Sequence, residues 1–425
     1  MKQLYKPAQW VPTVYFAMGL PFVAISMASV IMFKSKGVPD KDIAFWTSLI
    51  ILPWTLKPLW SPLLELFKTK KYVIVITEIF SAVLFGLIAF VLPLPDFFSY
   101  VIAILAVLAF SGATHDIAGD GIYLDDLNTK QQSKYVGWQG ACYNIAKVLT
   151  SGILIYVAGI LEKKYDVTTA WVIITVIYAF IMLAIGLYHI KMLPSNHTSS
   201  HMRNKSTGEQ MKGMLLVFKE FFQKKYIWYY LSFIVLYRFA EGFAMKIIPL
   251  FLKEERIKGG LGLSTEEVGL VYGTAGVAAF VIGSVLAGYY VSAKGLKKTI
   301  FTLCAIFNIP FIVYFLLAYY QPHSIVLIGS GVVLEYFGYG FGFVGLILFM
   351  MQQVAPGNHK MAHYAFATGI MNLGVMIPGM MSGFLSDELG YQYFFIFVLI
   401  AAIPAFFITW FVPFTHNEHS KINSD

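Results

Sequence analysis

Charged residues are scarce in this chain. Asp, Glu, Lys and Arg together make up 13% of its 425 residues, whereas a soluble domain carries about 25%. Apolar residues make up 58%, and the mean hydropathy is +0.69. So few charges cannot cover a water-facing surface. The composition therefore excludes an ordinary soluble domain and predicts a protein that crosses the lipid bilayer several times.

Cysteine and the usual catalytic motifs are also sparse. Cys142 and Cys304 are the only cysteines, and each lies in an apolar run, which argues against a disulfide framework or a metal site. The net charge of +8 is spread over short loops, so nucleic-acid binding is not expected. The sequence has no nucleotide-binding loop and no GxSxG elbow. We expect no enzyme activity, no catalytic residue, no cofactor and no metal.

Long apolar runs recur from one end of the chain to the other. Each has about 20 residues, the length that a helix needs to cross the hydrocarbon core. They predict an all-α membrane protein with about twelve transmembrane helices, the first of which follows the N-terminus without a cleavage signal. The runs lie near residues 10–33, 43–66, 72–92, 99–124, 134–158, 169–190, 226–252, 266–292, 298–319, 324–352, 361–385 and 391–413.

Basic residues gather in the loops on the side of the N-terminus, while the opposite loops mix acids with bases. Lys and Arg favour the cytoplasmic side, and an even number of spans places both ends on one side. We therefore expect cytoplasmic N- and C-termini. The basic residues on that side are Lys68, Lys70, Lys71, Lys130, Lys134, Lys294, Lys297 and Lys298, with those of the stretch Lys191–Lys225.

The longest polar stretch divides the chain in two. Residues 1–190 and 226–425 each hold six predicted spans, and residues 191–225 form a predicted cytoplasmic linker. Within the linker, Met211–Phe222 has apolar residues at helical spacing with lysines between them, which predicts a helix in the membrane interface. A basic turn follows the second span of each half. This layout resembles the Major Facilitator Superfamily, in which the solute site lies between the halves at mid-membrane.

The fourth predicted span carries three polar residues in an apolar run: His115, Asp116 and Asp120. The two aspartates lie one helical turn apart on one face. A carboxylate in hydrocarbon costs at least ~2.5 kcal/mol, so such residues normally face a partner or a polar cavity. They could simply hold helices together, but three in two turns favour a pathway for a solute or for protons. His115 leaves open a switch near neutral pH.

Two further spans of the first half contain candidate site residues. Lys57 and Glu65 lie on one face of the second span, but they are about 12 Å apart along the helix axis and cannot pair. Glu65 suggests a cytoplasmic gate. Lys57 either faces the cavity or extends its ammonium to the membrane interface. Asn144 and Lys147 share a face of the fifth span. We expect Lys147 to pair with Asp116 or Asp120, as a releasable or a permanent ion pair. Tyr143 could stack on a sugar ring or merely pack.

The second half has its own buried charges. Arg238 and Glu241 of the seventh span lie one turn apart, which suits an ion pair within the helix and also marks this span as lining the cavity. Tyr237 precedes them and is a further candidate for solute stacking. Glu335 of the tenth span has no charge near it in the sequence, so we treat it as a candidate proton carrier.

Taken together, these residues resemble the AmpG muropeptide permeases, whose relatives include acetyl-CoA transporters. The resemblance implies proton-driven import of GlcNAc-anhydro-MurNAc, with or without peptide, across the cytoplasmic membrane of a bacterium. The chain departs from the family pattern at His115, Glu65, Glu241 and Asn144. These departures affect the expected identity of the solute more than the expected fold or coupling. The motifs that carry the resemblance are Lys57-x-x-Trp60-Ser61-Pro62, Ala113-Thr114-x-Asp116-Ile117-x-x-Asp120 with Asp125, Leu236-Tyr237-Arg238 with Glu241, Glu266-Glu267-Val268-Gly269, and Glu335.

We therefore expect a proton-coupled importer that works by alternating access, functions as a monomer in the bilayer and takes a small solute. A siderophore or acyl-CoA carrier of the same fold is the alternative among transporters, and a transport-inactive sensor or scaffold is the alternative of another class. The expected solute-binding residues are Lys57, Tyr143, Asn144, Lys147, Tyr237 and Arg238. The expected proton-coupling residues are His115, Asp116, Asp120, Glu241 and Glu335, with Glu65 as a gate.

Overall fold

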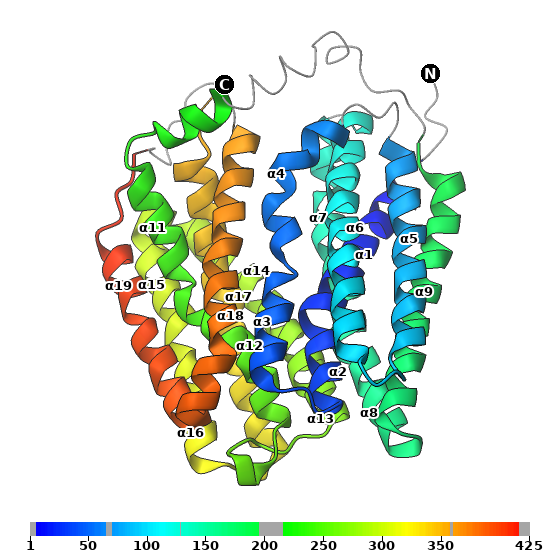
Figure 1. Ribbon diagram of the computed structural model, residues 1–425. Helices are drawn as coiled ribbons and strands as arrows, with labels where there is room; N and C mark the ends of the chain where they lie inside the picture. Colours follow the sequence, from blue (N-terminus) through cyan, green and yellow to red (C-terminus); the bar gives the residue numbers. More distant parts are fainter. Residues whose placement is uncertain (1–5, 65–69, 128, 195–215, 358–359, 416–425) are drawn as a thin grey trace. The chain divides into compact units, whose positions relative to one another are not determined.

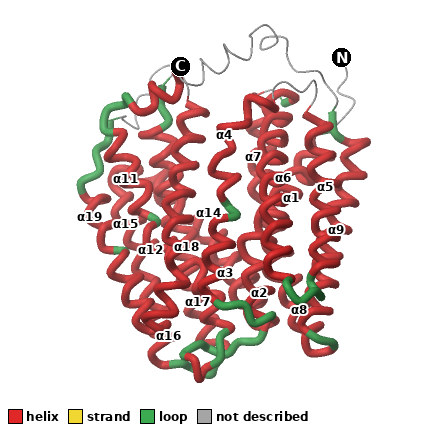
Figure 2. Tube along the Cα trace, viewed as in Figure 1, coloured by secondary structure: helices red, strands yellow, loops and turns green. Residues whose placement is uncertain are grey.

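The computed structural model describes residues 6–64, 70–127, 129–194, 216–357 and 360–415. Within these ranges every regular element is a helix, and no strand forms (Figures 1 and 2). The prediction of an all-α membrane protein is confirmed. This outcome follows from the apolar runs, because a helix satisfies all of its backbone hydrogen bonds internally in lipid.

Helices of the first half follow the predicted spans closely. The first span is a helix with one π-helical turn, Ala24–Ala28, between its two α-helical parts. The helices are α1 (Pro7–Val23), α2 (Ser29–Ser35), α3 (Asp40–Leu49), α4 (Leu52–Leu64), α5 (Lys70–Val91), α6 (Phe97–Asp126), α7 (Thr129–Val148), α8 (Leu154–Lys164) and α9 (Val167–Met192).

The second half repeats this pattern. Its last long helix is bent at Gly390, whose φ of 71° is left-handed and suits glycine. The helices are α11 (Ile227–Tyr237), α12 (Phe239–Lys253), α13 (Thr265–Val268), α14 (Val277–Lys294), α15 (Leu296–Asn308), α16 (Ile312–Tyr320), α17 (Ile325–Phe349), α18 (Lys360–Ala401) and α19 (Ile403–Trp410). In the linker, residues 216–222 are helical, while 211–215 lie outside the described residues.

Nine helices in the described parts of the chain are long and apolar enough to cross a membrane. The longest, Ala362–Trp410, contains the bend at Gly390 and covers two predicted spans. The predicted spans at 43–66 and 226–252 are each split into two shorter helices, at Ile50–Ile51 and at Arg238. Pro53, in the first turn of α4, lacks the N–H that would continue the helix. These splits reconcile nine long helices with about twelve predicted spans.

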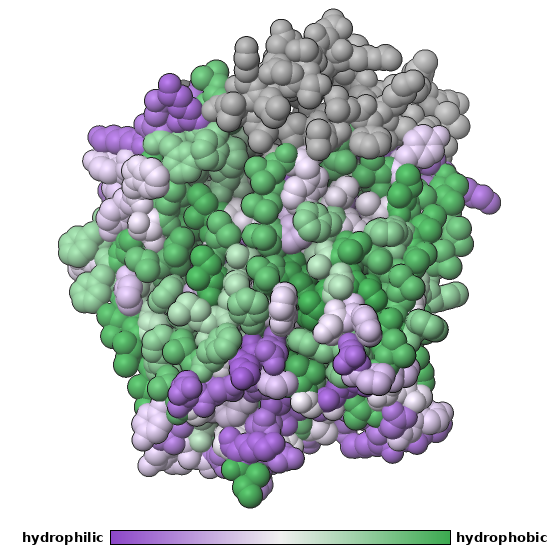
Figure 3. Space-filling model, viewed as in Figure 1, coloured by the Kyte–Doolittle hydropathy of each residue, from purple (hydrophilic) through white to green (hydrophobic). Residues whose placement is uncertain are grey.

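The chain divides into two compact units. The first comprises Met1–Pro39, Leu49–Lys205 and Ser264–Thr274, and the second comprises Asp40–Ser48, Ser206–Leu263 and Ala275–Asp425. The units thus follow the two halves of the sequence, except that α3 belongs to the second unit and α13 to the first. The predicted boundaries at 190 and 226 stay predictions. Apolar side chains cover most of the visible surface (Figure 3), as lipid contact requires.

In the first unit, α5 packs against α6 and α9, and α1 packs against α7. Near the end of the fifth span, α8 meets α13 so closely that Gly159 has no room for a Cβ atom, which would lie 2.2 Å from the backbone nitrogen of Glu266. Glu162 joins the same contact by accepting hydrogen bonds from Thr265 and from the indole of Trp171. Hydrogen bonds thus fix a contact that small residues make possible.

In the second unit, α14 and α17 pack closely against each other. A Cβ atom at Gly340 would lie 2.0 Å from the carbonyl oxygen of Phe280, and one at Gly283 would lie 2.3 Å from that of Phe337. These backbones therefore touch directly, as helices in membranes do where small residues face each other. Gly340 of the tenth span and Gly283 of the eighth therefore permit this close approach.

Candidate functional site

The carboxylate of Asp116, on α6, holds two side chains of α4. Lys57 Nζ lies 2.6 Å from Asp116 Oδ2, and Trp54 Nε1 donates to the same oxygen at 2.9 Å. Gly112 sits one turn before Asp116 and leaves space for the indole, because a Cβ atom there would lie 2.8 Å from Trp54 Cζ2. The other oxygen, Asp116 Oδ1, is buried and has no hydrogen-bonding partner among the described residues. One carboxylate oxygen can therefore still accept a donor.

Asp120 lies one turn further along α6 and has different partners. The Tyr15 hydroxyl, on α1, donates to Asp120 Oδ1 at 2.9 Å, and Gln139 Nε2, on α7, donates to the Tyr15 oxygen at 2.9 Å. Tyr15 is buried against the edge of Tyr123, whereas Asp120 remains exposed. An accessible carboxylate held by a phenol can exchange a proton with its surroundings. Neither Tyr15 nor Gln139 was predicted, because a tyrosine in an apolar helix is ordinarily a packing residue.

The pairing of Asp116 differs from what we expected. The sequence suggested Lys147 as the partner of Asp116 or Asp120, whereas the ammonium on Asp116 is that of Lys57. A pair between Lys147 and Asp120 stays a prediction. The side chain of Lys57 is 26% exposed and points at the carboxylate, which corrects the alternative in which it snorkels to the interface. Lys147 is half-buried on α7, and its backbone carbonyl accepts a hydrogen bond from Ser151.

The other fifth-span candidates lie on the same helix, α7. Tyr143 and Asn144 are half-buried, and Asn144 donates to the carbonyl of Gly140 at 2.8 Å. That bond stays within the helix and uses one of the two amide hydrogens. The assignment of Tyr143, Asn144 and Lys147 to the solute stays a prediction.

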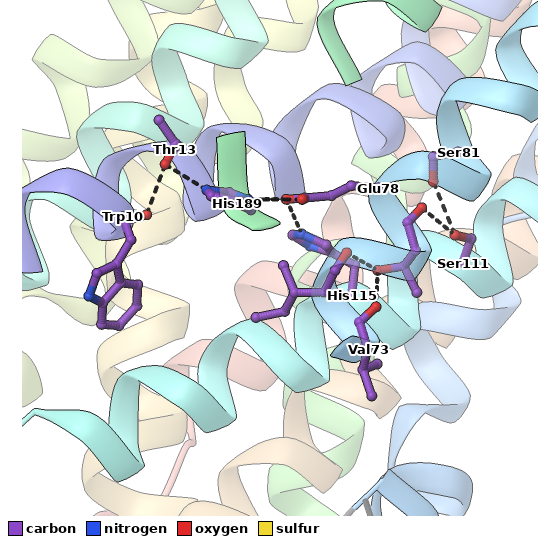
Figure 4. Close-up of polar contacts among 10 residues, drawn as sticks. Trp10, Thr13, Val73, Glu78, Ser81, Ser111, His115 and His189 are labelled. Atoms are coloured by element: carbon purple, nitrogen blue, oxygen red, sulfur yellow. Dashed lines mark hydrogen bonds and ion pairs between the residues drawn. The ribbon is translucent and has the colours of Figure 1, made fainter. Parts of the chain in front are cut away.

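His115 belongs to a buried cluster with Glu78 and His189 (Figure 4). Its Nε2 lies 3.0 Å from Glu78 Oε1, on α5. His189 Nδ1, on α9, lies 2.8 and 2.9 Å from the two oxygens of the same carboxylate. Glu78 and His189 were not predicted as site residues. The available signal was a single ionisable residue inside an otherwise apolar span, which is weaker than three such residues in two turns.

In the second unit, Arg238 and Glu241 form a two-point ion pair. Arg238 Nε and Nη2 each donate at 2.5 Å to a different oxygen of Glu241, and the guanidinium lies over the ring of Phe343. Arg238 lies at the break between α11 and α12 and Glu241 in the first turn of α12, so the ion pair that the spacing suggested is present. Tyr237 is fully buried and donates to the carbonyl of Gly342, a contact that serves packing.

Glu335, on α17, is buried and accepts a hydrogen bond from the hydroxyl of Tyr314 at 2.9 Å. The Tyr314 ring in turn stacks on Phe395. Glu335 was singled out because no charge is near it in the sequence, and a neutral phenol is a partner that sequence reasoning did not supply. Its role as a proton carrier stays a prediction.

Two remaining expectations concern the cytoplasmic gate and metals. Glu65 lies outside the described residues. Lys70, at the start of α5, pairs with Asp125 at the end of α6, with Nζ 2.7 Å from Oδ2.

In the part of the chain that the structure describes, no group of His, Cys, Asp or Glu is arranged to hold a metal ion. The polar residues instead form pairs and short hydrogen-bonded chains, which suit proton exchange and recognition of a polar solute.

Comparison with known proteins places the chain among transporters. The anhydromuropeptide permease of Escherichia coli (strain K12) is 23% identical over 415 residues, covering 96% of this chain and 80% of that protein. An uncharacterized protein of Haemophilus influenzae is 22% identical over 423 residues, covering 96% of this chain and 95% of the relative. The similarity to muropeptide permeases expected from the fourth-span motif is confirmed.

Solved structures agree on the fold. The D-xylose–proton symporter matches with a TM-score of 0.73 at 12% identity, covering 96% of this chain and 97% of the symporter. The family model described as "Major Facilitator Superfamily" matches residues 13–356 and 234–424. The anhydromuropeptide permease and the D-xylose–proton symporter are transporters by name. The chain belongs to the Major Facilitator Superfamily and is a multi-pass membrane transporter.

Proposed function

We propose that this protein imports a muropeptide or amino sugar of the GlcNAc-anhydro-MurNAc type, together with protons, by alternating access. The observation that carries the proposal is the arrangement at Asp116. There a half-buried carboxylate keeps one buried oxygen without a partner among the described residues, beside the ammonium of Lys57. The similarity to the Escherichia coli anhydromuropeptide permease supports the same solute class.

The chemistry of such a solute matches these groups. Its hydroxyl and acetamido N–H groups are donors that a carboxylate oxygen can accept, and its carboxylate can bind an ammonium. A solute carboxylate would compete with Asp116 for Lys57 and so loosen the pair. Lys147 and Arg238 are further cations for anionic groups of the solute, and the ring of Tyr143 is a candidate for contact with its sugar rings.

Proton coupling is assigned to the acids beside this pair. Asp120 is accessible and hydrogen-bonded to a neutral phenol, so it can accept a proton without breaking an ion pair. Asp116 would take a proton when Lys57 leaves it. Glu335 and Glu241 are the corresponding candidates in the second unit. Protonation removes the desolvation penalty of a carboxylate, which is a physical route by which a proton gradient can drive the solute.

The setting of the proposal is the bacterial cytoplasmic membrane. We propose that both termini face the cytoplasm, since basic residues gather in the loops on that side. We also propose that the monomer is sufficient for transport.

The test is uptake of labelled GlcNAc-anhydro-MurNAc by proteoliposomes that contain the purified protein, with and without an inward proton gradient. Accumulation that depends on the gradient supports both the solute and the coupling. Uptake without accumulation contradicts the coupling alone. No uptake by folded protein contradicts the solute, and the same vesicles then test a ferric siderophore and acetyl-CoA. A protein that moves none of them is a sensor or scaffold.

A further inference from the structure

Glu78, His115 and His189 lie together in the first unit, on α5, α6 and α9 (Figure 4). Their side chains are almost completely buried, with exposed fractions of 0%, 3% and 0%. Both histidines contact the one carboxylate, at 2.8 to 3.0 Å. Three ionisable groups in this setting are costly in a membrane protein, where such residues mark functional sites.

Hydrogen-bond donors decide the protonation state of His115. A carboxylate only accepts, so His115 must carry a proton on Nε2 to bind Glu78. Its other nitrogen, Nδ1, is buried and has no hydrogen-bonding partner in the described ranges. A second proton on Nδ1 would place an unsatisfied donor in the core, which costs about 1–3 kcal/mol or more. His115 is therefore a neutral, fixed donor to Glu78.

His189 is different because both of its nitrogens have partners. Nδ1 must donate to Glu78, while Nε2 lies 2.8 Å from the Thr13 hydroxyl on α1. That hydroxyl has one hydrogen and two acceptors within reach: His189 Nε2, and the carbonyl of Trp10 at 3.1 Å. If it donates to Trp10, Nε2 must be protonated and His189 is an imidazolium. If it donates to His189, the ring is neutral.

Thr13 thus satisfies both protonation states of His189, and only its hydroxyl must rotate between them. The net charge of the cluster changes from minus one, with Glu78 alone ionised, to zero when His189 takes up a proton. Histidine is the residue whose ordinary titration range includes neutral pH. The site can therefore gain or lose a proton without leaving a buried donor unsatisfied.

Several charged groups on the neighbouring helices have partners of their own. On α6, Asp116 holds Lys57 of α4 and Asp120 accepts from Tyr15 of α1, while Lys70 of α5 pairs with Asp125. Lys71, at the start of α5, and Lys191, at the end of α9, lie at the ends of their helices. The ionisable groups that interact with Glu78 are His115 and His189.

We propose that Glu78, His115 and His189 form a proton-binding site, separate from the Lys57–Asp116 pair, in which His189 takes up and releases the proton. His115 precedes Asp116 on α6, so the site is one residue away from the proposed solute site along the chain. Its link to transport rests on the proposed function, where it supplies a second protonatable centre. Proton binding itself requires no solute.

The experiment is an NMR pH titration of the histidine ring nitrogens, with 15N-histidine-labelled protein in nanodiscs between pH 5 and 9. The signals of His115 and His189 are assigned by their absence from the spectra of H115Q and H189Q. We expect His189 to convert between imidazolium and neutral forms, and His115 to keep one neutral tautomer. H115Q, whose amide can still donate to Glu78, should leave the His189 titration in place. In E78Q, His189 should lose its imidazolium signal at a pH where the unmodified protein shows it.

A neutral His189 throughout the range, or a titration unchanged in E78Q, overturns the proposal. Titration of His115 in place of His189 overturns the assignment of the proton. If E78Q does not fold, proton uptake between pH 9 and 5 is compared in unmodified protein and H189Q, and the variant should take up about one proton fewer. These readings stand even if GlcNAc-anhydro-MurNAc is not transported, so failure of the proton site and failure of the proposed function are distinguishable.

Discussion

Replacing Lys57 with methionine isolates the ion pair on Asp116. Methionine keeps an unbranched chain of similar length and removes the ammonium, so packing around α4 changes little while Asp116 loses its counter-charge. Trp54 still donates to Asp116 Oδ2, but one neutral donor cannot compensate the negative charge of a half-buried carboxylate. We expect K57M to destabilise the protein.

The size of the effect follows from the exposure of the pair. Removing one partner of a fully buried ion pair costs about 3–5 kcal/mol, whereas an exposed pair contributes about 0–1 kcal/mol. The side chains of Lys57 and Asp116 are 26% and 15% exposed, which lies between these limits and nearer the buried one. We therefore expect a loss of about 2 kcal/mol in K57M. The double variant K57M/D116N removes both charges, and most of that loss should be regained.

The assay is a double-mutant cycle on the free energy of unfolding, measured for K57M, D116N and K57M/D116N in one detergent or bicelle preparation. Asparagine keeps an acceptor for Trp54, so the cycle reports on the charges. The expected coupling between the two positions is about 1–2 kcal/mol. Additive effects, with coupling below about 0.3 kcal/mol, would refute the pairing and return Lys147 as the partner of this carboxylate.

Three further predictions address coupling and packing. D120N should abolish accumulation of solute against its gradient while leaving exchange between equal concentrations, so full accumulation would remove Asp120 from the mechanism. G283A should lower the free energy of unfolding by about 1–3 kcal/mol because its Cβ would meet the carbonyl of Phe337. The matched control is G288A on the same helix, where a Cβ atom would have no neighbour within 4 Å. G288A should be neutral or stabilising by up to about 1 kcal/mol. Y314F should destabilise by about 1–3 kcal/mol by leaving Glu335 without the phenol donor, and an unchanged melting temperature would show that this bond contributes nothing.

Contacts within a helix could be predicted, and contacts between helices could not. The Arg238–Glu241 partnership follows from the helical repeat, since residues three apart share a face whatever the rest of the chain does. The lengths of the spans follow from the thickness of the bilayer. The partner of Asp116 depends on how α4 and α7 are rotated and placed in depth against α6, and a single sequence holds no such information. Nothing in the sequence ranks Lys57 above Lys147 as that partner.

The missed site residues have a related cause. Glu78 and His189 each stand as a single ionisable residue in an apolar run, and only the packing of α5 between α6 and α9 joins them to His115. Thr13 and Tyr15 carry no charge, so nothing in their surroundings distinguishes them from packing residues. A rule that pairs every isolated ionisable residue of one span with those of other spans would have found the Glu78 cluster, though with many false partners.

The contact between α14 and α17 also limits which genetic changes can repair one another. Where two side chains meet, a larger residue on one helix can be rescued by a smaller one on the other. At Gly340 and Gly283 the neighbours are the carbonyl oxygens of Phe280 and Phe337, which no substitution can shrink. A selection for suppressors of G340A should therefore return glycine at position 340 itself, or changes that move a whole helix, and rarely a compensating residue across the contact.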